Sequence, residues 1–200
     1  MLQRFKSVKS LVLDPDGYLP THMVTGNAED EHLIRICNLF PNLISINLKF
    51  TDITYEGIKI MMLKCKKLKH IYMDNSMSGG LCGPQLNNLI ETYPNLKSLS
   101  LVNVGEIYQC ELPALSNCLE LEYLNLQKFE LTDQGILEIL DKCKCLKTLD
   151  ISNSNILWCL DSPKHAFMLK KFKEYDVEIY IKIDIIDSIN LSRITIDNGS

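Results

Sequence analysis

Cysteine is the residue type with the clearest capacity for chemistry in this chain. The sequence has eight cysteines, and Cys143 and Cys145 stand two positions apart, close enough to share a metal ion. A structural zinc site usually needs two close pairs of Cys or His ligands. The histidines are scattered instead, and Cys65, Cys118 and Cys143 recur at equivalent positions along the chain. We therefore interpret the cysteines as small apolar core side chains and predict neither a metal nor any other cofactor.

The aspartate pair Asp14 and Asp16 is a second candidate. The stretch LVLDPDG (11–17) resembles the nucleophile motif of haloacid dehalogenase-type phosphotransferases. This resemblance implies that Asp14 is a nucleophile and Asp16 a general acid, with magnesium between phosphate and protein. However, Tyr18 replaces the expected threonine or valine, no matching lysine or paired aspartates follow, and Asp-Pro-Asp-Gly is an ordinary turn sequence. A phosphatase stays a minor alternative, and we predict that the chain is not an enzyme and has no small-molecule substrate.

Composition restricts the partners and the location. The net charge is -4, so no overall positive field attracts nucleic acid or acidic membranes. The chain has only three arginines, Arg4, Arg35 and Arg193. This argues against a site that recognises phosphates or bases through the paired hydrogen bonds of arginine. No stretch approaches the roughly 20 apolar residues that span a bilayer, and Asp14 and Pro15 interrupt the N-terminal apolar run. We expect no membrane contact, and free thiols in a reducing, intracellular setting, which is the cytoplasm or alternatively the nucleus.

A repeat organises most of the chain. The spacing L-x-x-L-x-L, with related apolar residues allowed, occurs six times, and successive copies start 35, 25, 28, 25 and 25 residues apart. Periods of about 20–29 residues with this spacing are those of leucine-rich repeats. The copies are Val8-Leu11-Leu13, Leu43-Ile46-Leu48, Leu68-Ile71-Met73, Leu96-Leu99-Leu101, Leu121-Leu124-Leu126 and Leu146-Leu149-Ile151.

Each repeat combines a short strand with a helix. Leu124 and Leu126 alternate as in a strand with one buried face, whereas Ile136, Ile139 and Leu140 fall on one helical face. Neither element buries its apolar face alone, so stacked repeats must share one core. The predicted fold class is α/β, a short leucine-rich-repeat solenoid of about six or seven repeats with an inner parallel sheet and outer helices. A single domain covers 1–200, with an N-terminal capping repeat and insert over 1–42, regular repeats over 43–156, and a C-terminal cap over 157–200 in which a further strand starts near Val177.

The residue three places before the first repeat leucine defines a subtype. It is cysteine in three repeats, and the last of these follows a helix that opens with TDQGI (132–136). Over about residues 8–156 the pattern resembles the cysteine-containing leucine-rich repeats of F-box and related adaptor proteins of ubiquitin ligases. The resemblance implies a curved solenoid that binds proteins. No F-box is recognisable.

At one polar position, this sequence departs from the residue types usual in such repeats. The position after each strand, usually asparagine or cysteine, is Thr51, Ser76 and Ser154 in three repeats but Val104 and Phe129 in two others. Hydroxyls can bond to the backbone there, and apolar side chains cannot. We therefore predict a less regular arc around Val104 and Phe129.

Side chains that flank the buried strand leucines should point outward on the concave sheet face, with which solenoids usually bind. They form three columns: Ser10, Ser45, His70, Ser98, Tyr123 and Thr148; Val12, Asn47, Tyr72, Ser100, Asn125 and Asp150; and Asp14, Lys49, Asp74, Val102, Gln127 and Ser152. Aromatic residues are enriched at binding hot spots. The predicted partner-binding set is His70, Tyr72, Asp74, Tyr123, Asn125, Gln127, Thr148 and Asp150.

Lysines gather at the predicted helix ends. Cations there complement the helix dipole, which is the simpler explanation. The alternative is a basic edge that contacts RNA or an acidic partner, formed by Lys66, Lys67, Lys144 and Lys171. We conclude that the chain is a protein–protein interaction scaffold, an adaptor or a structural subunit of a larger complex. The alternatives are a subunit of a ribonucleoprotein assembly such as the ribosome, the substrate receptor of a ubiquitin ligase, and the phosphatase.

Overall fold

The computed structural model describes residues 8–12, 28–76, 81, 83–104, 115, 117–157, 174–175 and 177–180. Asp14, Asp16 and Lys171 lie outside these ranges, as do most of the insert within 1–42 and most of the cap within 157–200.

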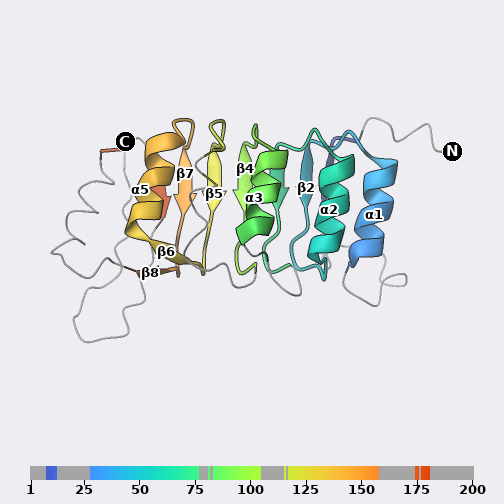
Figure 1. Ribbon diagram of the computed structural model, residues 1–200, viewed down its shortest axis with the longest axis horizontal. Coiled ribbons are helices and arrows are strands. Elements are labelled where there is room, and N and C mark those ends of the chain that lie inside the picture. The colour runs from blue at the N-terminus through green and yellow to red at the C-terminus, as the bar shows by residue number, and fades with distance from the viewer. Residues whose placement is uncertain are drawn as a thin grey trace.

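A parallel sheet runs through the whole described part of the chain (Figure 1). Its strand order follows the sequence, β1-β2-β3-β4-β5-β7-β9, so each strand pairs with those of the adjacent repeats. The predicted leucine-rich-repeat solenoid is confirmed, and so is a strand beside Val177. The strands are β1 (Ser10–Val12), β2 (Ser45–Asn47), β3 (His70–Tyr72), β4 (Ser98–Ser100), β5 (Tyr123–Asn125), β7 (Thr148–Asp150) and β9 (Glu178–Tyr180).

Helices cover one face of this sheet in a row (Figure 1), and the other face carries no helix in the described part of the chain. Threonine side chains cap two of them: Thr54 accepts a hydrogen bond from Glu56 N, and Thr132 accepts one from Gly135 N. Because each helix links two parallel strands, all of them run in the same direction. They are α1 (Asp30–Leu39), α2 (Tyr55–Lys64), α3 (Gly83–Thr92) and α5 (Asp133–Lys142).

The core lies between the sheet and the helices. The central strand residues and the helix residues Ile136, Ile139 and Leu140 are buried together, as their periodicity predicts. The cysteines close this core at the helix ends. The thiol of Cys65 donates to Phe40 O at 3.8 Å, that of Cys118 to Tyr93 O at 4.0 Å, and that of Cys143 to Leu115 O at 3.5 Å. The thiols thus reach carbonyls of the preceding repeat and pack as buried core groups.

In the main sheet, a left-handed turn follows each strand from β2 to β7. Among the described residues other than glycine, those with positive φ are Phe50, Asn75, Asn103, Lys128 and Asn153, one per repeat. The hydroxyls of Thr51 and Ser76 donate to backbone carbonyls of their own turn, and Ser154 donates to Leu126 O in the preceding repeat.

The strands that precede Val104 and Phe129 are regular: β4, β5 and β7 pair in one register over Ser98–Ser100, Tyr123–Asn125 and Thr148–Asp150. A less regular arc at the two positions themselves stays a prediction. Val104 keeps the backbone bond of the turn, from its N–H to Leu101 O at 3.2 Å, and Phe129 N donates to the hydroxyl of Ser154 at 3.3 Å. Backbone groups and a neighbouring serine therefore replace the missing side-chain bonds, while both apolar side chains enter the core.

Two further strands pair beside α5, and the sequence did not predict them. β6 (Glu130–Thr132) and β8 (Asn155–Leu157) form a separate parallel pair. Each follows the turn after a main strand, so the pair extends the contact between two adjacent repeats. Within the described residues, no helix has both the length and the apolar character needed to cross a bilayer.

Candidate functional site

The sheet face opposite the helices, here called the open face, carries the side chains that flank the buried strand residues. The strand pairing confirms the first two predicted columns: Ser45, His70, Ser98, Tyr123 and Thr148 are successive register partners, and so are Asn47, Tyr72, Ser100, Asn125 and Asp150. Because the sheet is in register, side chains from different repeats come together in rows across it. Whether these residues bind a partner stays a prediction.

The aromatic side chains of β3 are held by neighbouring repeats. His70 Nδ1 lies 2.9 Å from the hydroxyl of Ser98, and Lys49 Nζ lies 5.9 Å from the centre of the Tyr72 ring. Both aromatic side chains remain partly exposed. A serine nucleophile would need its histidine oriented by a third group, and no described residue makes such a bond to the His70 ring. The His70–Ser98 contact therefore positions the imidazole.

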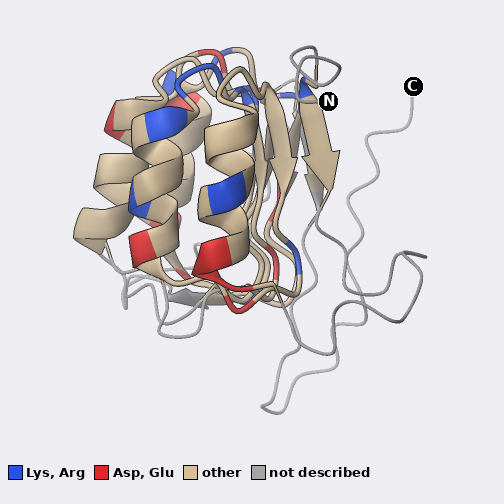
Figure 2. Cartoon of the chain, turned by 90° about the vertical axis from the view of Figure 1, so that its right-hand side faces the viewer, with Lys and Arg blue, Asp and Glu red and all other residues tan. Residues whose placement is uncertain are grey.

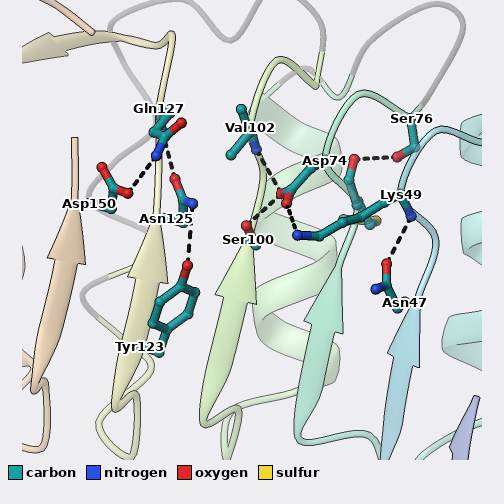
Figure 3. Close-up of polar contacts among 11 residues, drawn as sticks. Asn47, Lys49, Asp74, Ser76, Ser100, Val102, Tyr123, Asn125, Gln127 and Asp150 are labelled. Carbon is teal, nitrogen blue, oxygen red and sulfur yellow. Dashed lines mark hydrogen bonds and ion pairs between the residues drawn. The ribbon is translucent and has the colours of Figure 1, made fainter. Parts of the chain in front are cut away.

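Asp74 joins three repeats in one buried polar cluster (Figure 3). Its carboxylate lies 2.6 Å from Lys49 Nζ and accepts hydrogen bonds from Ser100 Oγ at 2.5 Å and Val102 N at 3.2 Å. The sequence predicted an outward-facing aspartate, and this is corrected: only 6% of Asp74 is exposed. Three donors compensate the loss of water around the carboxylate, which is what a buried charge requires.

A second polar chain links the neighbouring strands β5 and β7 (Figure 3). Asn125 donates to the hydroxyl of Tyr123 at 3.3 Å and accepts from Gln127 N at 3.1 Å. Gln127 Nε2 in turn donates to Asp150 at 2.5 Å, and Ser152 Oγ donates to the same carboxylate at 2.7 Å. Asn125 is only 7% exposed, so its predicted exposure is also corrected. Tyr123, Gln127 and Asp150 stay partly exposed, as does Thr148 at the start of β7.

The charged residues divide between the two ends of the strands. These ends form the two long edges of the solenoid, and 'edge' is used in this sense below. Figure 2 shows most lysines and arginines along the edge where helices end and strands begin, and most acidic residues along the opposite edge. The predicted residues Lys66, Lys67 and Lys144 all lie on the first edge and are exposed.

Further along the same edge, Glu122 contacts Lys147 at 2.6 Å and Lys97 at 2.7 Å. The hydrogen bonds from Lys147 and Lys97 lower the pKa of Glu122 from its ordinary value of 4.5 to about 2. These two lysines are therefore already paired.

Two of the buried thiols, those of Cys118 and Cys143, are poor candidates for chemistry. Burial, followed by the influence of Cys143, raises the pKa of Cys118 to about 12, and burial raises that of Cys143 to about 11. Thiolate is the reactive form, so these cysteines are protonated and inert at neutral pH. No group of three or more His, Cys, Asp or Glu side chains suited to a metal ion occurs in the described part of the chain.

Sequence reasoning missed one exposed aromatic residue, Phe50. Half of it is exposed, and its φ is 56° in the turn that follows β2. The equivalent residues Asn75, Asn103 and Asn153 supply the signal that could have revealed it, because asparagine adopts this conformation more readily than phenylalanine does.

The sheet topology and the repeats define the fold of this chain as a leucine-rich-repeat solenoid. No protein-family model matches it. It is 28% identical over 179 residues to a putative F-box/FBD/LRR-repeat protein of Arabidopsis thaliana, covering 80% of this chain and 42% of that protein. It is 31% identical over 133 residues to NACHT, LRR and PYD domains-containing protein 5 of Homo sapiens, covering 63% of this chain and 11% of that protein. The chain therefore spans less than half of either curated relative.

Among solved structures, the chain is similar to an internalin from Listeria monocytogenes. The TM-score is 0.45 at 17% identity, over 74% of this chain and 44% of the internalin. Both curated relatives are named for leucine-rich repeats, and the Arabidopsis thaliana protein is named for an F-box as well.

Proposed function

We propose that this chain is a non-catalytic protein-interaction scaffold that binds its partner through the open face. It would act as an adaptor or as a structural subunit of a larger complex, in the cytoplasm. The observation that carries the proposal is the set of partly exposed side chains held in place across repeats, namely His70 by Ser98, Tyr72 beneath Lys49, and Gln127 by Asp150.

Such fixed side chains favour binding for an entropic reason. Immobilising a free, flexible side chain at an interface costs about 0.5–1.5 kcal/mol. Contacts within the sheet have already restricted His70, Tyr72 and Gln127, so less of this cost falls on association. Tyrosine also offers a large apolar surface and a hydroxyl, which makes Tyr72 and Tyr123 the favoured anchors.

The sheet topology argues against an enzyme. In open α/β sheets, ligands bind in a crevice where the strand order reverses. The main sheet follows the chain from β1 to β9 without a reversal in the described residues, so it offers no crevice of this kind. β1, which precedes Asp14 and Asp16, pairs only with β2 among the described strands. Turnover of a generic phosphate ester with magnesium, lost in Asp14→Ala, would overturn this part of the proposal.

One of the relatives supports a second candidate function. The Arabidopsis thaliana protein is named for an F-box as well as for its repeats, which supports a role for this chain as the substrate-binding part of a ubiquitin ligase. Co-purification of the tagged chain with ubiquitin-ligase subunits would support this role. A purified complex without any such subunit would contradict it.

A matched pair of tyrosines tests the main proposal. Tyr72 on the open face and Tyr55 on α2 are both partly exposed, and each has a lysine ammonium over its ring, at 5.9 Å and 5.6 Å. The tagged chain, Tyr72→Ala and Tyr55→Ala would be expressed in native cells, checked for folding by circular dichroism, and their captured proteins quantified by mass spectrometry. We expect Tyr72→Ala to lose a partner that Tyr55→Ala retains. Equal recovery by both variants would contradict binding through the open face.

A further inference from the structure

Four lysines lie close together where α2 ends and β3 begins. We call Lys64, Lys66, Lys67 and Lys69 the lysine cluster; all four are exposed. Among the described residues, no carboxylate lies within 4.0 Å of any of their ammonium groups, whereas Lys97, Lys142 and Lys147 on the same edge each contact a glutamate. The cluster is therefore a concentration of uncompensated positive charge.

The helix dipole accounts for only part of this charge. The C-terminus of a helix carries the equivalent of about -0.5 elementary charge, and its effect is confined to the last turn. Lys64 lies in the last turn of α2 and is sufficient to offset it. Lys66, Lys67 and Lys69 follow the helix and leave an excess of positive charge that needs another explanation.

The excess charge is greatest in one repeat, although Lys144 occupies the position of Lys66 three repeats further on. The positions equivalent to Lys66 and Lys67 are Pro41 and Asn42 in the preceding repeat, and Pro94 and Asn95 in the following one. One repeat further on they are Leu119 and Glu120, where Glu122 also lies on the same edge. A ligand that follows the edge would thus leave the positive region within one repeat and then meet carboxylates.

The lysine cluster also adjoins the open face directly. Lys69 precedes His70, and its backbone carbonyl accepts hydrogen bonds from Lys97 N and Ser98 N of the next repeat. The serine hydroxyl holds His70, and Tyr72 is two residues further along β3. A segment bound across β3 would pass from the aromatic side chains to the lysines without a break.

We infer that the lysine cluster binds a short acidic segment, rich in Asp or Glu, of the protein partner. This inference rests on the proposed function, because the same partner occupies the open face. Its charge complements the cluster, and its short length fits a positive region one repeat wide. A nucleic acid fits less well, because its continuous phosphate charge would extend to Glu120 and Glu122 and meet a chain of net charge -4. The cluster also contains no arginine.

Two charge-matched double variants test the inference with the whole purified chain. Lys66→Glu/Lys67→Glu reverses two charges in the cluster, and Arg35→Glu/Lys128→Glu reverses two exposed cationic side chains elsewhere. Fluorescence anisotropy would measure binding of a short labelled polyglutamate peptide and of an oligouridylate of equal length, at low salt. We expect the first variant to weaken polyglutamate binding about tenfold and the second to change it less than about twofold. Added salt should weaken binding by the original chain.

Three results would overturn the inference: equal losses in both variants, no binding of polyglutamate at low salt, or tighter binding of the oligouridylate. The last result would identify the cluster as a nucleic-acid site. Partner capture separates this inference from the proposed function. If Lys66→Glu/Lys67→Glu retains the partner that Tyr72→Ala loses, the acidic segment is wrong and the scaffold stands. If Tyr72→Ala retains every partner, the proposed function itself fails.

Discussion

Gly57 lies so close to the carboxylate of Asp30 that a β-carbon at this glycine would be 2.3 Å from Asp30 Oδ1. The carboxylate cannot simply move away, because it accepts hydrogen bonds from Thr54 N at 2.7 Å and Thr54 Oγ1 at 2.5 Å. Asp30 begins α1 and Thr54 caps α2. Because Gly57 has no side chain, Asp30 at the start of α1 can accept hydrogen bonds from Thr54 at the start of α2.

Gly57→Ala should consequently destabilise the chain, although alanine is the better helix former. We expect the free energy of unfolding to fall by about 1–3 kcal/mol, because the variant must break the Asp30–Thr54 bonds or displace a helix. In an Asp30→Ala background the conflict with the carboxylate is absent and only Ile53 Cγ2, 3.2 Å from the added β-carbon, is close. Gly57→Ala should then change the free energy of unfolding by less than about 1 kcal/mol, because the helix propensity of alanine offsets this contact. Urea denaturation of the four chains would measure both effects. The same change in both backgrounds would contradict this explanation.

The left-handed turns offer a stabilising substitution. Lys128 has a φ of 65°, at the position that holds asparagine in three other repeats. An ordinary side chain in this conformation costs roughly 1–2 kcal/mol, whereas asparagine tolerates it. Lys128→Asn should therefore raise the free energy of unfolding by about 0.5–1 kcal/mol. The reverse change Asn153→Lys, at the equivalent exposed turn, should lower it by a similar amount. Urea denaturation that shows no opposite effect of the two variants would argue against strain at this position.

Asp74 should contribute more to stability than its position beside an exposed sheet face suggests. Asp74→Ala leaves the nearly buried Ser100 hydroxyl and the Val102 N–H without their acceptor. We expect a loss of about 2–4 kcal/mol in the free energy of unfolding. Lys49→Met should cost less, because the Lys49 side chain is 38% exposed and the carboxylate keeps its other two donors. A smaller loss for Asp74→Ala than for Lys49→Met would contradict the role assigned to the cluster.

Glu122 should make stability depend on pH in the acid range. Its pKa in the folded chain is about 2, below the ordinary value of 4.5. Since the folded state favours the ionised form, the stabilisation is complete above about pH 4.5 and disappears as the pH falls to about 2. Thermal melting of the original chain and Glu122→Gln would be compared across this range. The difference in Tm should be largest near neutral pH and vanish near pH 2; a difference that does not change with pH would show that the ion pairs are not its source.

Much of the fold can be predicted from the sequence, because the same spacing of apolar residues recurs in every repeat. The spacing of Leu121, Leu124 and Leu126 predicts strand and core together, and the strand register then places Tyr123 and Asn125 in known columns. A single strand of three residues is too short to be predicted from its own alternation of apolar and polar residues. Six aligned copies with the same alternation make the prediction possible. The same reasoning overlooked β6, because no alternation distinguishes Glu130–Thr132 from a turn.

The sequence placed the candidate site correctly but did not reveal its interior contacts. The columns identify Asp74 and Asn125 as members of the open face, yet both are buried among hydrogen-bonded side chains. These bonds depend on the third column, where Lys49 and Gln127 reach across to neighbouring strands. Side-chain reach between strands is a property of the packed sheet and not of the spacing along the chain.

Photo-cross-linking from the open face tests the central claim most directly. Benzoylphenylalanine would replace Tyr72 in one chain and Tyr55 in a control chain, and each would be irradiated in native cells. We predict that position 72 cross-links to a specific partner protein and that position 55, on the helix side, does not. A partner that cross-links from position 55 and not from position 72 would contradict binding through the open face of the sheet.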